Sequence, residues 1–456
     1  MPDTTPRPQA IEPTLGREIG SVARLAAPLS LAKMSHMVMA FVDTAMAGQV
    51  GREALGGLAL ANACYFTLFL FGLGIIGGLE PVAGGELARR GPVGARDSAE
   101  AGLWVGGVAG LFAALVSVLL VPTLLLAMGQ DPAVVEQARR FLLIGAWGGI
   151  PALAAQAIIA QLTLHRANFV VTAAMATIVL VHVAINLVLV PGRFGLPALG
   201  IQGLAVSRLV GDALLLGILM LATRRLGRWD VLPVSIRRPS MPLVRQVLRY
   251  GGSIGVQFVL EVAAFNLVTV LMGRLGAAVL AGSTIALNVA SFSFTLVMGV
   301  ASAGAARVAI AIGQGDRGGA RRSGWATLCL AWMLAVGSGA VMLLGDDWIV
   351  SRYTSDPEVA QWALRFMVCA VAFQLFDMTQ GACFGVLRGA GDTRVPALFN
   401  IAGYWVVGLP LAFWLVFGLD RDPTWLWWGL TAGLMLIAVL LLVRFQRTLP
   451  AVPEEA

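Results

Sequence analysis

Two stretches of this chain repeat one another: DPAVVEQARRF at residues 131–141 and DPEVAQWALRF at residues 356–366. Six positions are identical in register, at an offset of 225 residues. The same offset pairs Gly48 with Gly273. Chance repeats are common for Ala and Leu, but this string also shares Asp, Pro, Arg and Phe. The sequence therefore predicts two homologous halves.

The composition indicates a membrane protein. Of the 456 residues, 58% are hydrophobic and only 12% are charged, whereas a soluble domain carries about 25% charged residues. A soluble enzyme, a disordered protein and a disulfide scaffold are excluded. A helix needs about 20 apolar residues to cross the bilayer. We expect twelve such spans, at approximately 20–46, 54–80, 100–127, 134–160, 169–191, 199–223, 247–272, 278–305, 323–345, 358–386, 395–418 and 425–444.

The alternating pattern of a transmembrane β-barrel is absent from the sequence, so we expect an all-α polytopic membrane protein. Six spans return the chain to its starting side, and the two six-helix lobes therefore share one orientation. A pseudo-two-fold axis along the membrane normal and a cavity between the lobes are typical of a carrier with alternating access. The predicted divisions are a tail at 1–17, an N-lobe at 18–225, a linker at 226–244, a C-lobe at 245–447 and a tail at 448–456.

The distribution of positive charge predicts the topology. The chain has a net charge of +7, from 31 arginines and a single lysine against its acids. The tails and even-numbered loops hold 21 arginines and the odd-numbered loops hold 8, so the positive-inside rule places both termini in the cytoplasm. The arginines have no aromatic platform among them, which argues against nucleic-acid binding. The N-terminus lacks the features of a removable signal peptide, and we expect the four cysteines to be free.

Charged groups at bilayer depth are the candidate functional residues. An ionised carboxylate at the centre of a span costs about 2.5–3.5 kcal/mol, so it faces a cavity or a partner. Four acids lie deep in the expected spans, namely Asp43, Asp212, Glu261 and Asp377. Each could instead be structural and satisfied by neighbours. For Asp212 that alternative is an i,i+4 ion pair with Arg208.

Span 1 also predicts a polar helix face. Lys33 and His36 are three residues apart, and Asp43 lies two turns further along the same face. His182 and Asn186 in span 5 are four residues apart and could line the same interior. These groups could form a proton path or simply face a watery lobe interior.

Other motifs carry no chemistry. GLGIIG at 72–77 lies inside an apolar span, where helix packing is the better interpretation. The sequence has no Walker phosphate loop, so ATP does not drive the protein, and no catalytic constellation, so we do not expect an enzyme.

Several strings, in this order, resemble the multidrug and toxic compound extrusion (MATE) transporters in their NorM-like bacterial branch. They are VDTAMAG at 42–48, FGLG at 71–74, LRGAGD at 387–392 and YWVVGLP at 404–410, together with Pro28, Glu261, Gln374 and Asp377. The resemblance covers essentially all twelve spans. It implies a V-shaped pair of lobes that exports amphipathic, often cationic, drugs and dyes in exchange for Na⁺ or H⁺.

The resemblance also implies site residues. Glu261 and Asp377 match the C-lobe cation site, with Na⁺ possible there, and Asp43 matches the N-lobe carboxylate. Candidate residues of the substrate cavity are His36, His182, Asn186, Gln257, Phe265, Asn288, Tyr404 and Trp405. The chain departs from the family pattern at His182, where the branch has asparagine, at Ser283-Thr284, at Val297, where the branch has a proline, and at Phe373. These departures leave the coupling ion and any hinge in span 8 open.

The expected mechanism follows. A cationic drug binds cavity carboxylates from inside, the lobes switch, and an entering cation neutralises Glu261 and Asp377 and releases the drug outward. We expect no cofactor beyond the coupling ion, a monomer, and a location in the bacterial cytoplasmic (inner) membrane. One alternative is a flippase for a lipid-linked precursor, which needs a cationic cavity for phosphate, whereas the deep charges are mostly acidic. Another is a lipid-modifying membrane enzyme, which needs an interfacial nucleophile or metal cluster.

Overall fold

The structure is a computed structural model that describes residues 14–225 and 239–449. The expected tails at 1–17 and 448–456 and the expected linker at 226–244 lie mostly outside the described residues. Within these ranges the chain is helical, without strands. Twelve helical spans are long and apolar enough to cross a membrane, which confirms the all-α polytopic fold.

The N-lobe consists of nine α-helices that make up the first six spans. Their bounds are α1 Leu15–Val50, α2 Arg52–Gly77, α3 Leu79–Arg90, α4 Pro92–Leu119, α5 Val121–Ala127, α6 Pro132–Gly145, α7 Gly149–Leu164, α8 Asn168–Leu189 and α9 Ile201–Arg225. A short 3₁₀ turn at Ala146–Gly148 joins α6 to α7. The second span extends beyond its expected end at 80, because α2 is followed by α3 and the span runs to Arg90. The third span begins at Pro92, before the expected residue 100, and ends with α5 at Ala127 as expected.

The C-lobe forms the other six spans. Its α-helices are α10 Met241–Leu275, α11 Ala277–Gly313, α12 Arg317–Leu344, α13 Asp346–Tyr353, α14 Pro357–Gly389, α15 Arg394–Ile401, α16 Leu409–Phe413 and α17 Trp425–Thr448. Two π-helical segments, Ala402–Gly408 and Trp414–Gly418, interrupt the eleventh span. The eighth span, α11, is one continuous helix through Val297.

The repeated DPxV string starts an equivalent helix in each lobe. Asp131 caps α6 by accepting the amide of Ala133 at 2.8 Å, and Asp356 caps α14 by accepting the amide of Glu358 at 2.9 Å. A proline at the first helical position suits both starts, since its missing N–H would have no partner there.

The alanine of each string then sits at an equivalent helix crossing. A Cβ on Gly57 of α2 would overlap the backbone of Ala138, and a Cβ on Gly282 of α11 would overlap that of Ala363. Gly57 and Gly282 are themselves 225 residues apart. The sequence repeat is therefore also a repeat of helix packing.

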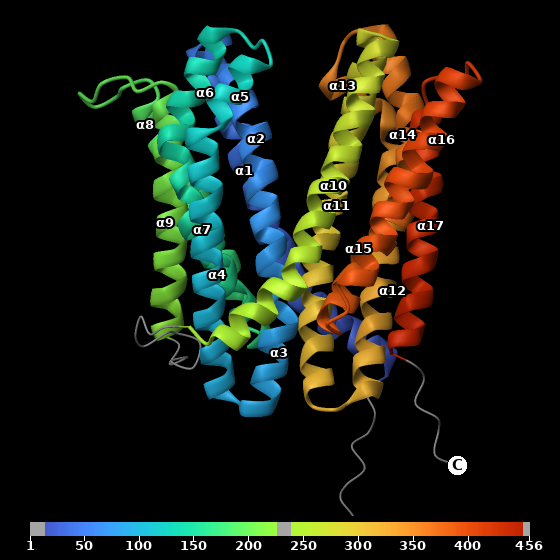
Figure 1. Ribbon diagram of the computed structural model, residues 1–456. Helices are drawn as coiled ribbons and strands as arrows, with labels where there is room; N and C mark the ends of the chain where they lie inside the picture. The colour runs from blue at the N-terminus through green and yellow to red at the C-terminus, as the bar shows by residue number, and fades with distance from the viewer. Residues whose placement is uncertain (1–13, 226–238, 450–456) are drawn as a thin grey trace, which may run out of the picture.

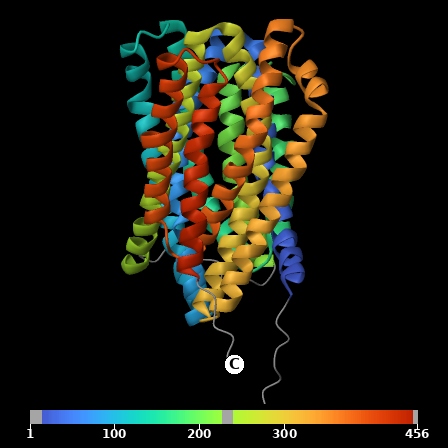
Figure 2. The same ribbon diagram turned by 90° about the vertical axis from the view of Figure 1, so that its right-hand side faces the viewer.

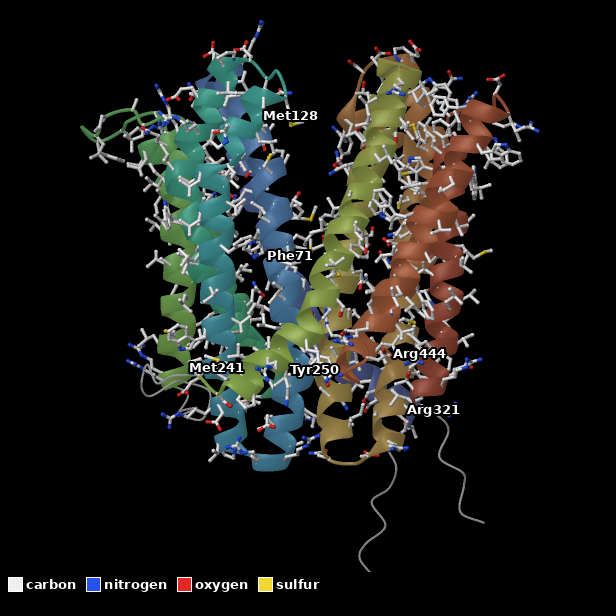
Figure 3. The ribbon with its side chains drawn as sticks, in the orientation of Figure 1. Phe71, Met128, Met241, Tyr250, Arg321 and Arg444 are labelled. Carbon is white, nitrogen blue, oxygen red and sulfur yellow. The ribbon has the colours of Figure 1, made fainter. Side chains whose placement is uncertain are left out.

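The two lobes form a V (Figure 1). They diverge toward the end that carries α5, α6 and α13 and converge toward the end where the described chain begins and ends; Figure 2 gives the view from the C-lobe side. Figure 3 places Arg321 and Arg444 at the converging end and Met128 at the diverging end. Arg321, which follows an even-numbered span, thus lies at the same end as Arg444 near the end of the described chain.

Small residues bring the lobes together at the converging end. α10 begins beneath the N-lobe and ends in the C-lobe (Figures 1 and 3), and it crosses α2 with Gly74 against Gly255. A Cβ on Gly251 would overlap the carbonyl oxygen of Ile75. Such close backbone approach needs residues without side chains. It closes the lobe interface with protein backbone where α2 crosses α10.

This seal yields a prediction with an adjacent control. Gly251→Val should destabilise the structure by about 1–3 kcal/mol, since the added methyl groups must push α10 away from α2. Gly252 meets no atom within 4 Å of a built Cβ, so Gly252→Val reports only the change in helix propensity. The measurement is the thermal midpoint of the purified variants in detergent. Equal midpoints for the two variants would contradict the close contact.

Candidate functional site

A cavity of about 440 Å³ lies mainly within the N-lobe and reaches the lobe interface. Residues of α10, α11 and α14 of the C-lobe complete its wall. Its apolar lining includes Met39, Phe66, Phe69, Leu73, Ile76, Met175, Ile178, Phe258 and Met298. The volume is in the range typical of small-molecule sites, and the aromatic and methionine side chains suit a flat apolar ligand.

The charged lining is balanced rather than acidic. Three acids, Asp43, Glu80 and Asp212, face this cavity together with three strong bases, Lys33, Arg208 and Arg388. The prediction that the deep charges are mostly acidic therefore does not describe the cavity, because Lys33, Arg208 and Arg388 line it beside the acids.

The polar face of α1 is present as predicted. Lys33, His36 and Asp43 all line the cavity, since residues three, four and seven apart share one face of a helix. Lys33 lies toward the converging end. Asp43 lies ten residues further along, or about 15 Å at 1.5 Å per residue.

Asp43 is the centre of a buried network. Its Oδ1 lies 2.8 Å from His182 Nε2 and accepts a hydrogen bond of 2.8 Å from Asn186 Nδ2. The Ser207 hydroxyl lies 2.7 Å from His182 Nδ1 and donates to the His182 carbonyl at 3.1 Å. His182 and Asn186 are thus brought together as the i,i+4 spacing predicts. Ser207 joins them from α9.

Arg208 does not pair with Asp212. Among the ion pairs of the described residues, none joins these two side chains. Arg208 instead donates to Asn62 at 3.2 Å and lies 4.5 Å from the ring centroid of Tyr65. A guanidinium over an aromatic face is stabilised by the ring quadrupole, which explains why it turns toward α2.

The lobes are joined by ion pairs that include Glu80 with Arg388 and Glu18 with Arg307. Glu80 of α3 accepts a 2.6 Å bond from Arg388 of α14 at the cavity. Glu18 of α1 accepts a 2.9 Å bond from Arg307 of α11 and a 2.6 Å bond from Ser323 of α12. Sequence reasoning missed both pairs, because each joins residues about 300 positions apart and the two partners are not equivalent positions of the 225-residue repeat.

The C-lobe acids lie apart from this cavity. Glu261 of α10 accepts a 3.2 Å bond from Gln380 and a 3.1 Å bond from Asn400. Asp377 of α14 is buried, at 7% exposure, and makes no ion pair with the described residues. Neither acid is among the residues that line the 440 Å³ cavity. A drug there would therefore not contact either acid in this conformation.

An aromatic cluster packs beside Glu261 and Asp377. Phe265 makes edge contacts with Phe373 and Tyr404, at centroid separations of 5.8 and 5.7 Å. The Trp405 indole donates to the Leu260 carbonyl at 3.1 Å. Tyr404 and Trp405 lie in the π-helical segment that precedes Pro410. Local π segments are frequent at functional sites.

The remaining predicted residues differ in their surroundings. Asn186 and Gln257 are buried, and Asn288 is exposed. Of the predicted cavity residues, His36 and His182 line the cavity, as does the acid Asp43. The other predicted cavity residues do not line it, namely Asn186, Gln257, Phe265, Asn288, Tyr404 and Trp405. The structure therefore divides the predicted set between an N-lobe cavity and a C-lobe acid cluster.

Twelve spans in two repeated lobes, with a cavity that both lobes line, define a membrane transporter. The sequence profile of the MatE family matches residues 28–188 and again residues 253–414, once in each lobe. The chain belongs to the MatE family of transporters, and it is not an enzyme.

Similar proteins cover nearly the whole chain. The chain is 34% identical over 435 residues to the "Probable multidrug resistance protein NorM" of Rhizobium meliloti strain 1021, covering 93% of this chain and 92% of that protein. The crystal structure of the eukaryotic MATE transporter AtDTX14 has a TM-score of 0.84 at 22% identity, with 95% and 98% coverage. The outward-facing conformation of a multidrug resistance MATE family transporter of the MOP superfamily has a TM-score of 0.86 at 15% identity, with 94% and 96% coverage.

The lobe-bridging pair at the cavity can be tested by a double-mutant cycle. Glu80→Gln and Arg388→Gln should each destabilise the protein by about 3–5 kcal/mol, since each leaves one buried charge unpaired. The double variant should lose less than the sum of the two. Chemical unfolding or thermal midpoints measure this coupling.

The control for this cycle is the exposed pair of Glu136 and Arg139, whose side chains are 39% and 51% exposed. Solvent screens such a pair, so its cycle should show far weaker coupling. Additive losses at Glu80 and Arg388 would show that the bond contributes nothing to the lobe contact.

Proposed function

We propose that this protein exports amphipathic drugs by alternating access, in exchange for an inbound Na⁺ or H⁺. The names of its relatives support multidrug efflux. The observation that carries the exchange step is the bonding of the deep acids. Glu261 accepts bonds from two amides, and Asp43 is bonded by an imidazole and an amide. In the part of the chain that the structure describes, neither acid is paired with Arg or Lys, so a mobile cation can bind without displacing a fixed one.

The C-lobe cluster offers oxygen ligands for a cation. Besides Glu261 and Asp377, three buried oxygens, namely Gln380 Oε1, Asn400 Oδ1 and the Tyr404 hydroxyl, have no hydrogen-bond partner among the described residues. Hard cations prefer carboxylate and carbonyl oxygens, which suits Na⁺. A proton needs only one carboxylate in a low-dielectric site. Both ions remain consistent with this donor set.

The N-lobe network offers a second place for a proton. Ser207 donates its single hydroxyl proton to the His182 carbonyl, so it can accept from Nδ1–H of the imidazole. With Nδ1–H present, Nε2 of a neutral His182 accepts a hydrogen bond from a protonated Asp43, whereas Nε2–H of a cationic His182 donates one to the Asp43 carboxylate. Adding one proton changes which atoms donate, and with it the charge that Asp43 presents to the cavity.

The cavity suits an apolar ligand with a cationic group. Its methionine and aromatic wall would bury the apolar body, while Asp43 and Asp212 supply negative charge. Because Glu261 and Asp377 lie outside the cavity, ion binding there acts on the drug through the position of α10 and α14, both of which also contribute to the wall. The membrane potential supplies about 2.3 kcal/mol per charge per 100 mV for this cycle.

The expected setting of this transporter is the bacterial cytoplasmic membrane, with both termini in the cytoplasm. In this orientation the converging end of the V faces inward and the diverging end faces outward. One chain supplies both lobes and the whole cavity, which supports action as a monomer. No ATP site is required, since the ion gradient drives export.

The acid cluster gives the first functional prediction. Glu261→Gln and Asp377→Asn should each reduce ethidium efflux from cells to the background rate, because an amide cannot exchange a cation. Both variants should retain the elution profile and thermal midpoint of the parent. Glu358→Gln, at an exposed acid in the first turn of α14, is the matched control and should export normally. Full efflux in both cluster variants would rule out this site.

The coupling ion is identified by imposing one gradient at a time. In proteoliposomes, an inward Na⁺ gradient at equal pH, or an inward H⁺ gradient without Na⁺, should drive ethidium transport. Whichever gradient works should lose its effect in Glu261→Gln. Transport driven by neither gradient would contradict ion exchange.

The flippase alternative requires a cavity with a different net charge. A lipid-linked phosphate needs an excess of positive charge, whereas the three bases here are matched by three acids. Translocation of a fluorescent lipid-linked sugar in proteoliposomes, with no dye transport, would support the flippase.

A further inference from the structure

The cavity holds a lysine that the proposed exchange step does not use. Lys33 lines the cavity from α1, and its ammonium makes neither a hydrogen bond nor an ion pair with any described residue. It is also the only lysine in the 456-residue chain. A charge at this depth is expensive unless it is paired or faces a ligand. The position of Lys33 on the cavity wall therefore calls for an anionic partner.

The charges around Lys33 leave its own charge uncompensated. Arg388 and Glu80 line the same cavity and interact electrostatically with Lys33, and the Glu80 carboxylate is already bonded to Arg388 at 2.6 Å. These three side chains together carry a net charge of +1. His36, one turn along α1, lines the same cavity and brings no negative charge. The converging end of the cavity is therefore positive.

The other end of the cavity is negative. Asp43 lies about 15 Å further along α1, and its partners are the imidazole of His182 and the amide of Asn186. Arg208 and Asp212 on α9 cancel one another in net charge. Apolar side chains of α2 and α8, such as Phe66, Phe69 and Met175, line the space between the two ends. The cavity thus has a positive end, an apolar middle and a negative end.

We propose that this cavity binds amphipathic zwitterions, with a carboxylate of the ligand on Lys33 and a cationic group toward Asp43. The proposal rests on the proposed export function and names its substrate class. A flat aromatic body between the two ends would pack on the phenylalanines and methionines. An ammonium and a carboxylate form a charge-assisted hydrogen bond, which a purely cationic ligand cannot make at this end.

Two dyes with one aromatic body test this assignment. Rhodamine 110 carries a free carboxylate and a cationic xanthene, and rhodamine 123 is its methyl ester. The measured quantity is the ratio of their transport rates in phosphatidylcholine proteoliposomes. Lys33→Gln should lower this ratio by at least about tenfold, the effect of losing one bond between charged groups. Lys33→Arg should largely keep the ratio, because it preserves the positive charge.

The control variant is Ser35→Ala. Ser35 is on the same helix, outside the cavity lining, and its hydroxyl donates to the Leu31 carbonyl of its own helix at 3.2 Å. Its ratio should equal that of the parent. A ratio unchanged in Lys33→Gln overturns the assignment. If the parent transports neither dye, the proposed export function itself fails. If the parent transports rhodamine 123 but not rhodamine 110, the export function is supported and the zwitterion site is overturned.

The single lysine permits a test that does not depend on transport. Reductive ¹³C-methylation labels Lys33 and the terminal amine and keeps both positively charged. The Lys33 signal is the one that is absent from the NMR spectrum of Lys33→Arg. A saturating concentration of rhodamine 110 should shift this signal, and rhodamine 123 should shift it much less. An unmoved signal overturns the proposal. If phosphatidylglycerol in the vesicles abolishes rhodamine 110 transport, Lys33 binds a lipid headgroup, and the substrate assignment is wrong.

Discussion

The structure depends on how charges are satisfied inside an apolar bundle. Water is scarce at bilayer depth, so every ionised group there needs a partner, a cavity or a ligand. Glu18 and Glu80 are paired with arginines across the lobe interface. Glu261 and Asp43 are held by amide and imidazole groups. The first kind of bond fixes the lobes together, and the second leaves a carboxylate available for exchange.

The two lobes repeat the scaffold but not the charges. Gly57 and Gly282 pack on equivalent alanines 225 residues apart, so helix crossings are conserved between the halves. At the same offset, Lys33 corresponds to Phe258, and His36 corresponds to Glu261. Packing of small residues is shared by both halves, and so are Asp131 and Asp356 at the helix starts, whereas deep charged groups such as Lys33 and Asp377 occur in one half only. The resulting asymmetry gives the N-lobe a cavity and the C-lobe an acid cluster.

Much of this arrangement could be predicted from the sequence. Span length, the DPxV repeat and the loop arginines depend on local composition, and they predicted the twelve spans and their shared orientation. The face of α1 that carries Lys33 and Asp43 followed from helical periodicity alone. The partners of Arg208 and Glu80 could not be predicted, because lobe contacts bring together residues from distant spans. The separation of Glu261 from the cavity likewise depends on how α10 tilts across the bundle.

The contact of α2 with α10 has an electrical consequence. Where Gly74 lies on Gly255, backbone touches backbone, and water and ions have little room to pass. A transmembrane voltage falls mainly across the part of a protein that excludes electrolyte, so the field should be concentrated in this thin layer rather than spread over the bilayer. The cavity, including the ends marked by Lys33 and Asp43, would then sit near the potential of the compartment to which it opens. Voltage would act chiefly on the rearrangement of the lobes, and far less on ligand entry.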